Sequence, residues 1–202
     1  MSSLFFDEGW SPEGAIHCDF SEMEGTVCYC DKNAEEQIEE RFKTLPLNAI
    51  HWIDGGDFHY LTEIWMRRMK EPFSLILIDN HPDDQKPAFG GEILSCGGWV
   101  AHSRRTNPLL TDNSDTVYLS IDLDYLNTDY ARTNWNQGTA TLQELLDMLD
   151  TLLYGKKLAG VDICGGITSQ QGGTPEDFAI NRRTRTALLD YFETYSNMAS
   201  ES

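Results

Sequence analysis

The chain has 202 residues, which is enough for one domain with a substantial apolar core, and we expect residues 1–202 to form a single domain. Hydrophobic residues make up 40% and charged residues 24%, an ordinary composition for a soluble globular protein. The formal net charge of −18 repels phosphate backbones, so we expect no nucleic-acid partner. No apolar run approaches the ~20 residues of a membrane helix, and the segment Met1 to Glu8 lacks the basic residues of a secretory signal. We therefore expect a cytoplasmic protein that does not contact membranes.

The first half of the chain alternates strand-like and helix-like segments. Residues 48–53 and 73–78 are predicted to be strands, as are residues 116–121, because each is a short apolar run. Residues 58–70 carry apolar side chains at helical spacing and are predicted to form a helix with Asp57 as its N-cap.

The second half continues the alternation. Residues 142–153 have apolar positions at helical spacing and follow a capping box that begins at Thr141. Residues 158–163 form another predicted strand. The last helix begins after the N-cap Thr174 and ends near Tyr195, and the residues beyond it are predicted to be frayed. Apolar strands that alternate with amphipathic helices predict a three-layer α/β/α fold with a mainly parallel sheet.

Three of the predicted strands end in side chains that can bind metal ions. Two strand ends carry acids at alternate positions, which share one face of an extended segment, and one carries a histidine. The carboxyl ends of parallel strands meet at one edge of the sheet, so these side chains are expected to converge. The six candidate ligands are His59, Asp79, His81, Asp83, Asp122 and Asp124.

Two imidazoles and four carboxylates suit a pair of divalent cations. Mixed nitrogen and oxygen ligation favours Mn²⁺, with Fe²⁺, Co²⁺ or Zn²⁺ as substitutes. Two such cations lower the pKa of a shared water and hold a hydroxide that can attack an electrophilic carbon. Taken singly, each motif has another interpretation. The Asp-x-Asp can be a helix cap or loop acid, and the Asp-x-His-x-Asp can be a polar loop.

The three motifs resemble the landmarks of the ureohydrolase (arginase–agmatinase–formiminoglutamase) superfamily, which shares its fold with the histone deacetylases. The family's G-G-D-H, D-A-H-x-D and S-x-D-x-D appear in the same order as Gly55-Gly56-Asp57-Phe58-His59, Asp79-Asn80-His81-Pro82-Asp83 and Ser120-Ile121-Asp122-Leu123-Asp124. The resemblance implies hydrolysis of a C–N bond in a linear guanidino, amidine or amide compound by a metal-bridging hydroxide. It implies one Mn²⁺ held by His59, Asp79, Asp83 and Asp122, and a second held by Asp79, His81, Asp122 and Asp124. It also implies that Asp83 orients the hydroxide.

The chain departs from the family pattern at several places. Phe58 occupies the usual place of the first histidine, and His59 follows it. Cys96 stands where the family often has a proton-shuttling histidine, and His102 is a substitute candidate for acid–base work or a surface histidine. The glutamate that pairs with a guanidinium group is absent, because the corresponding strand continues into Gly165-Gly166, and glycine cannot pair with a cation. We therefore expect the metal centre to be kept and the pocket for a small-molecule substrate to differ.

Two other functions remain open. One is a non-catalytic metal- or metabolite-binding protein, which the missing glutamate and histidine favour. The other is a metal-dependent phosphatase of the haloacid-dehalogenase type, since Asp122-Leu123-Asp124 follows a strand, although Leu126 stands where that class has Thr or Val. The resemblance also leaves a homo-oligomer as one expectation, because family members are often trimers or hexamers.

Cysteines, glycines and aromatic residues add weaker signals. The chain has five cysteines, and we expect them to be reduced and mostly buried. The glycine-rich segment 165–174 is a plain connection, a flap that brings Gln170 or Gln171 to a substrate, or an anion cradle. Trp99, Trp135 and Tyr125 are either core residues or the wall of an apolar pocket.

Overall fold

A computed structural model describes residues 2–3, 12–87 and 93–200, with side chains for residues 12–87 and 93–196. Most of the segment Met1 to Glu8, on which the signal-peptide argument rests, lies outside the described residues. The main sheet has six strands in the order β2-β1-β4-β8-β7-β5, and all neighbouring pairs are parallel. These strands are β1 (Ser2–Ser3), β2 (Ile16–His17), β4 (Ile50–Trp52), β5 (Ser74–Ile78), β7 (Thr116–Asp122) and β8 (Lys157–Cys164). Two further strands, β3 (Tyr29–Cys30) and β6 (Leu94–Ser95), form a small antiparallel sheet.

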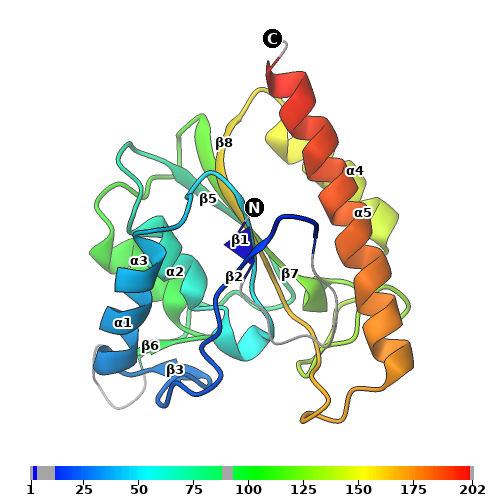
Figure 1. Cartoon of the computed structure of the whole chain (residues 1–202). Helices are drawn as coiled ribbons and strands as arrows, with labels where there is room; N and C mark the ends of the chain where they lie inside the picture. Colours follow the sequence, from blue (N-terminus) through cyan, green and yellow to red (C-terminus); the bar gives the residue numbers. More distant parts are fainter. Residues whose placement is uncertain (1, 4–11, 88–92, 201–202) are drawn as a thin grey trace.

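Helices cover both faces of the main sheet (Figure 1). On one face lie α1 (Lys32–Phe42), α2 (Leu61–Met66) and α3 (Trp99–Thr106), and on the other lie α4 (Leu142–Leu153) and α5 (Pro175–Ser200). Each face has its own apolar core: Phe42 and Trp65 belong to the first, and Leu149 and Leu188 to the second. The predicted three-layer α/β/α architecture is therefore confirmed.

Two predicted helix starts agree with the structure in detail. The Thr141 side chain accepts a hydrogen bond from the Glu144 backbone N–H, and Glu144 reaches back to the Thr141 N–H, which completes the capping box of α4. Thr174 and Asp177 exchange the same pair of bonds at the start of α5. The polar groups that satisfy the first turn of each helix were therefore readable from sequence.

Other predictions were wrong in detail. The helix predicted over residues 58–70 is only α2, six residues long, and a 3₁₀ turn at Gly56–Phe58 precedes it. Asp57 lies inside that turn and is not an N-cap, because its carboxylate accepts hydrogen bonds from distant loops instead. The last helix continues past Tyr195 to Ser200. The Tyr195 hydroxyl donates to the carbonyls of Leu153 and Lys156, which fixes this end of α5 to the end of α4.

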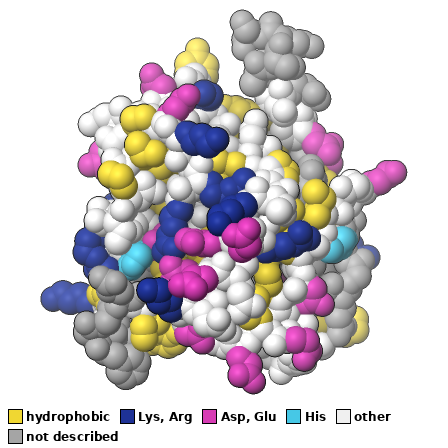
Figure 2. Space-filling model, turned by 60° about the vertical axis from the view of Figure 1, so that its left-hand side comes forward, with side chains coloured by type: hydrophobic (Ala, Val, Ile, Leu, Met, Phe, Trp, Pro, Cys, Tyr) yellow, Lys and Arg dark blue, Asp and Glu magenta, His cyan; other side chains and the backbone are white. Residues whose placement is uncertain are grey.

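The surface in Figure 2 mixes charges of both signs. Lys and Arg side chains lie beside Asp and Glu on this face, so the net charge of −18 does not make it uniformly acidic. Opposite charges also pair between helices: Arg67, which follows the end of α2, pairs with Glu35 and Glu39 of α1 and with Glu63 of α2. Within the described part of the chain, no helix has the length and apolar character that a membrane crossing requires.

Candidate metal centre

Four adjacent strands end at the same edge of the sheet, the lower edge in Figure 1. Asp122, the last residue of β7, lies opposite Cys164 at the end of β8. Ile78 of β5 lies opposite Ile121 of β7, so Asp79 follows beside Asp122. The parallel register therefore brings the acidic motifs together.

The first group of potential ligands surrounds His59, which lies in the turn between the 3₁₀ helix and α2 and is 1% exposed. Its Nδ1 atom lies 3.2 Å from Asp79 Oδ2, 3.1 Å from Asp83 Oδ2 and 3.4 Å from Asp122 Oδ2. Its other nitrogen, Nε2, is hydrogen-bonded to Ser120 Oγ at 2.8 Å. One ring nitrogen thus faces three carboxylates while the other fixes the orientation of the ring, as in histidines that bind metal ions.

The second group contains Asp79, His81 and Asp124, whose ligand atoms lie within 4.8 Å of one another. His81 Nδ1 lies 2.8 Å from Asp124 Oδ2. Backbone donors hold the carboxylates in place: the N–H of His81 bonds to Asp79 at 2.6 Å, and the N–H of Asp124 bonds to Asp122 at 2.9 Å. Asp79 belongs to both groups, so the structure brings all six predicted residues into one cluster.

The protein alone compensates the charge of this cluster only in part. Burial, reinforced by the charges of Asp122 and Asp79, raises the pKa of Asp124 to about 9. Burial also raises the pKa of Asp122 to about 6, although His59 opposes the shift. Burial lowers the pKa of His59, but the carboxylates of Asp79 and Asp83 outweigh it and hold that pKa well above its usual value. An arrangement in which a buried acid, Asp124, keeps its proton at neutral pH for lack of positive charge fits divalent cations.

Asp83 has an unusual backbone and a buried partner. Its φ of 45° lies in the left-handed region, which Asp tolerates better than most residues. Its Oδ2 atom accepts a hydrogen bond of 2.7 Å from Nε1 of Trp99, which is fully buried. Trp99 is therefore a core residue that orients Asp83, and it is not part of the cavity wall.

Cys164 and Gly165, at the end of β8, contact the metal cluster from one side. Cys164 is fully buried, and its sulfur forms a third potential ligand group with His59 and Asp122. Gly165 has a φ of 93°, and a Cβ atom there would lie 2.5 Å from Asp122 Oδ1. A glutamate cannot occupy this position without displacing Asp122, which explains physically why glycine follows the strand.

The cavity beside the cluster has a volume of about 230 Å³. In addition to the cluster it is lined mainly by Cys28, Tyr29, Gln85, Ser95, Cys96 and Trp135. Of the two substitute acid–base candidates, the structure brings Cys96 to this cavity. His102 is not among the lining residues, and its Nδ1 lies 2.5 Å from Oε1 of the buried Glu63. Tyr125 packs against the α4–α5 core instead.

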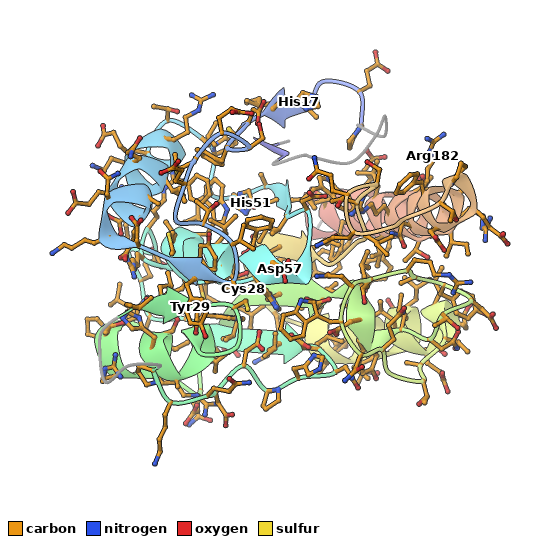
Figure 3. All side chains as sticks on the ribbon, turned by 90° about the horizontal axis from the view of Figure 1, so that it is seen from below. His17, Cys28, Tyr29, His51, Asp57 and Arg182 are labelled. Carbon is orange, nitrogen blue, oxygen red and sulfur yellow. The ribbon has the colours of Figure 1, made fainter. Side chains whose placement is uncertain are left out.

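Asp57 collects hydrogen bonds from several loops around the cavity mouth. It accepts from Asn134 Nδ2 at 3.2 Å, Trp135 Nε1 at 3.0 Å and Gln171 Nε2 at 3.2 Å, and the Cys28 thiol donates at 3.5 Å. Figure 3, which views the molecule from below, shows Cys28 beside Asp57. The side chain of Gln171 therefore fastens its loop to Asp57.

Trp135 forms one wall of the mouth. Its ring lies 5.9 Å from that of His81 in an edge-on arrangement, and a Cβ atom on Gly56 would meet it at 2.7 Å. Sequence reasoning named Trp135 as a possible wall residue, but it missed the role of Asp57 and the bonds that Trp99 and Ser120 make to the cluster. The missed contacts join segments far apart in the chain, and no local pattern signals them.

Comparison with known proteins gives one related sequence and several related structures. No family model matches the chain. A Thermotoga maritima protein described as uncharacterized is 30% identical over 159 residues, or 64% of this chain, and the match spans 63% of the relative's length.

The structural similarities are extensive at low sequence identity. A hypothetical agmatinase from Burkholderia thailandensis aligns with a TM-score of 0.62 and 17% identity, over 91% of this chain and 71% of the other. The proclavaminate amidino hydrolase from Streptomyces clavuligerus gives 0.62 and 19%, over 88% and 74%. The formimidoylglutamase from Bacillus subtilis gives 0.58 and 12%, over 77% and 65%. The chain therefore has the fold of these ureohydrolase structures.

Proposed function

We propose that residues 1–202 form one metal-dependent hydrolase domain of the ureohydrolase type, which cleaves a C–N bond in a small linear guanidino, amidine or amide compound. The observation that carries the proposal is the cluster at the strand ends, where two groups of potential ligand atoms share Asp79. The order of the three motifs and the fold of the structural neighbours support the same assignment.

The proposed ligands are those that the resemblance implies. His59, Asp79, Asp83 and Asp122 would hold one ion, and Asp79, His81, Asp122 and Asp124 the other. Imidazole and carboxylate ligands suit two Mn²⁺ ions, with Fe²⁺, Co²⁺ or Zn²⁺ as substitutes. When bound, such a pair would lower the pKa of water and would supply a hydroxide nucleophile at neutral pH.

The side chains of the chain itself orient the reacting groups. Trp99 donates to Asp83 and fixes one of its oxygens, so that the other can orient the attacking water. Cys96 is the proposed proton donor because it lines the cavity at the place where the family often has a proton-shuttling histidine. Burial and the nearby Cys28, Asp83 and Asp57 raise its pKa to about 12, so the thiol is neutral at pH 7 and a weaker acid than a histidine. The proposal gives His102 no proton-transfer role, because that ring pairs with Glu63 outside the cavity.

The pocket favours a substrate unlike arginine. In the ureohydrolase family that the chain resembles, a glutamate pairs with the guanidinium group, and Gly165 stands at that position here. A side chain on Gly165 would collide with Asp122. The cavity of about 230 Å³ beside the cluster has room for the reacting end of a small molecule. In this proposal the protein keeps the attack on a C–N bond, but it recognises the remainder of the substrate by contacts that differ from those of arginase.

The second candidate is a metal- or metabolite-binding protein without catalytic activity. Two observations favour it: the glycine at position 165 and the thiol of Cys96 where the family often has a histidine. Both candidates require the metal centre, so the centre is tested first and the activity afterwards.

The test measures metal content and then product release. Wild-type protein loaded with Mn²⁺ is expected to retain about two equivalents, and Asp122→Ala less than one, by elemental analysis. Asp129→Ala is the matched control, because Asp129 is an exposed acid seven residues along the chain. Equal metal contents in Asp122→Ala and wild type would refute the centre. Release of urea, ammonia or amine from a panel of guanidino, amidine and amide compounds then separates the enzyme from the binding protein.

A further inference from the structure

Two cysteines face each other across the small antiparallel sheet. In the pairing of β3 with β6, Tyr29 lies opposite Ser95 and Cys30 opposite Leu94. The backbone N–H of Cys96 donates to the carbonyl of Cys28 at 2.9 Å, so the same register continues to Cys28 and Cys96. The two thiols lie close enough for each to affect the pKa of the other. The two side chains therefore form a cross-strand pair.

The backbone hydrogen bond between Cys96 and Cys28 brings the two residues close to the separation that a disulfide spans. Residues directly opposite in antiparallel strands have Cα atoms about 4.5–5.5 Å apart. A disulfide spans Cα separations of about 4.4–6.8 Å. Cys28 itself lies just before β3 with a φ of 60°, so a bond between the two sulfurs requires rotation of the side chains and a local adjustment of the backbone at Cys28.

Both sulfurs are reachable from the cavity. Cys28 and Cys96 line the cavity beside the metal cluster, and the other three cysteines, Cys18, Cys30 and Cys164, are buried and do not line it. Cys28 is the more exposed member of the pair, with Cys96 only 8% exposed. A small oxidant that enters the cavity therefore meets Cys28 first.

The backbone at Cys28 is also unusual. Its φ is 60°, and among the described non-glycine residues only Cys28 and Asp83 have a positive φ. Both line the cavity. Residues other than Gly, Asn and Asp are rarely held in this region, and such strain gathers at functional sites.

We infer that Cys28 and Cys96 form a redox modification site, which closes to an intramolecular disulfide on reaction with a low-molecular-weight disulfide. The Cys28 sulfur attacks one sulfur of the reagent and releases one small thiol, which leaves a mixed disulfide on Cys28. The Cys96 sulfur then attacks the Cys28 sulfur and releases the second small thiol. The protein loses two hydrogens and the reagent gains them, so the step is balanced and a dithiol reverses it.

Closure of this bond would alter the cavity without touching a proposed metal ligand. The Cys28 thiol donates its proton to Asp57, and the disulfide has no proton to donate. Asp57 would lose one of the bonds that hold the loops at the mouth, while a covalent link would join β3 to β6. Burial raises the pKa of Cys28 and of Cys96, so the exchange is expected to be slow at neutral pH and faster in mildly alkaline buffer.

The test maps the product on the full chain. Reduced protein is incubated with oxidised glutathione, the remaining thiols are alkylated, and the disulfide-linked peptides are identified by mass spectrometry. The expected major product joins Cys28 to Cys96, with a mass lower by two hydrogens, and is removed by dithiothreitol. The proposal is independent of metal content and of any hydrolase activity, so its outcome does not depend on the proposed function.

Two variants sharpen the experiment. Cys28→Ser is expected to abolish the link, and the matched control Cys30→Ser, whose side chain lies opposite Leu94, is expected to leave it in place. A product in which Cys30, Cys18 or Cys164 is the main partner would overturn the proposal. A product that carries one glutathione on Cys28 and another on Cys96 would also overturn it. If a variant does not fold, the disulfide map of the wild-type protein alone distinguishes these outcomes.

Discussion

The metal-free protein is predicted to lose stability as the pH rises from about 4 to about 9. In the folded chain the pKa of Asp124 is about 9 and that of Asp122 about 6, against about 3.9 for an unfolded aspartate. A carboxyl whose pKa is raised by folding binds more protons in the folded state than in the unfolded state. The free energy of unfolding therefore falls as the pH rises through the interval between the two values.

The size of the effect follows from proton counting. Between about pH 7 and pH 8, Asp122 is mostly ionised in both states, whereas Asp124 keeps its proton only in the folded state. One proton of difference corresponds to about 1.4 kcal/mol per pH unit. His59 acts in the same direction, because its raised pKa makes the folded state retain a proton that the unfolded state loses above about pH 6.5.

Urea unfolding, followed by circular dichroism at several pH values with a chelator present, measures this slope. Asp124→Asn removes the titrating carboxyl and is expected to reduce the slope by about 1.4 kcal/mol per pH unit, while Asp129→Asn leaves it unchanged. Mn²⁺ at a hundred times its dissociation constant adds about 2.7 kcal/mol. Binding displaces protons, so the gain at fixed Mn²⁺ grows with pH. A metal-free protein whose stability is constant or rises between pH 7 and pH 8 would refute the reasoning.

Three substitutions test other contacts of the site. Trp99→Phe removes the donor to Asp83 and is expected to weaken Mn²⁺ binding at least about tenfold by calorimetry, and unchanged affinity would contradict this. Gly165→Ala places a Cβ atom 2.5 Å from Asp122 in a left-handed backbone, and urea unfolding should show a loss of at least about 1 kcal/mol together with lower metal content. Asp57→Asn should speed hydrogen exchange at residues 134–137 and leave metal content unchanged, whereas equal exchange rates would show that Asp57 does not hold this loop.

The sequence predicted those elements whose signal is local. The apolar runs of β5, β7 and β8 and the caps of α4 and α5 are short patterns that burial and backbone hydrogen bonding impose directly. Helix α1 was missed, although it carries its own signal: Asp31 caps it by accepting from the Ala34 N–H, and Ala34, Ile38 and Phe42 recur every four residues.

The contacts that shape the cavity lay beyond sequence reasoning. Asp57 bonds to Asn134 and to Gln171 across 77 and 114 residues of chain. Nothing in the local sequence of Asp57 distinguishes a carboxylate that caps a helix from one that ties loops together. That choice depends on which donors the folded chain brings within reach, and the prediction of an N-cap failed for this reason.

The residue inserted into the G-G-D-H landmark links the retained centre to the altered cavity mouth. The segment Gly56–Phe58 is a 3₁₀ turn, in which successive side chains are about 120° apart. Asp57, Phe58 and His59 therefore point in three directions: Asp57 to the loops, Phe58 to the apolar core and His59 to the carboxylates. The tight turn absorbs the additional residue, so the imidazole still reaches the strand ends. The same turn directs Asp57 to Trp135 and Gln171, and these hydrogen bonds hold the loops that form the walls of the cavity mouth. The metal-binding motifs alone do not specify these walls.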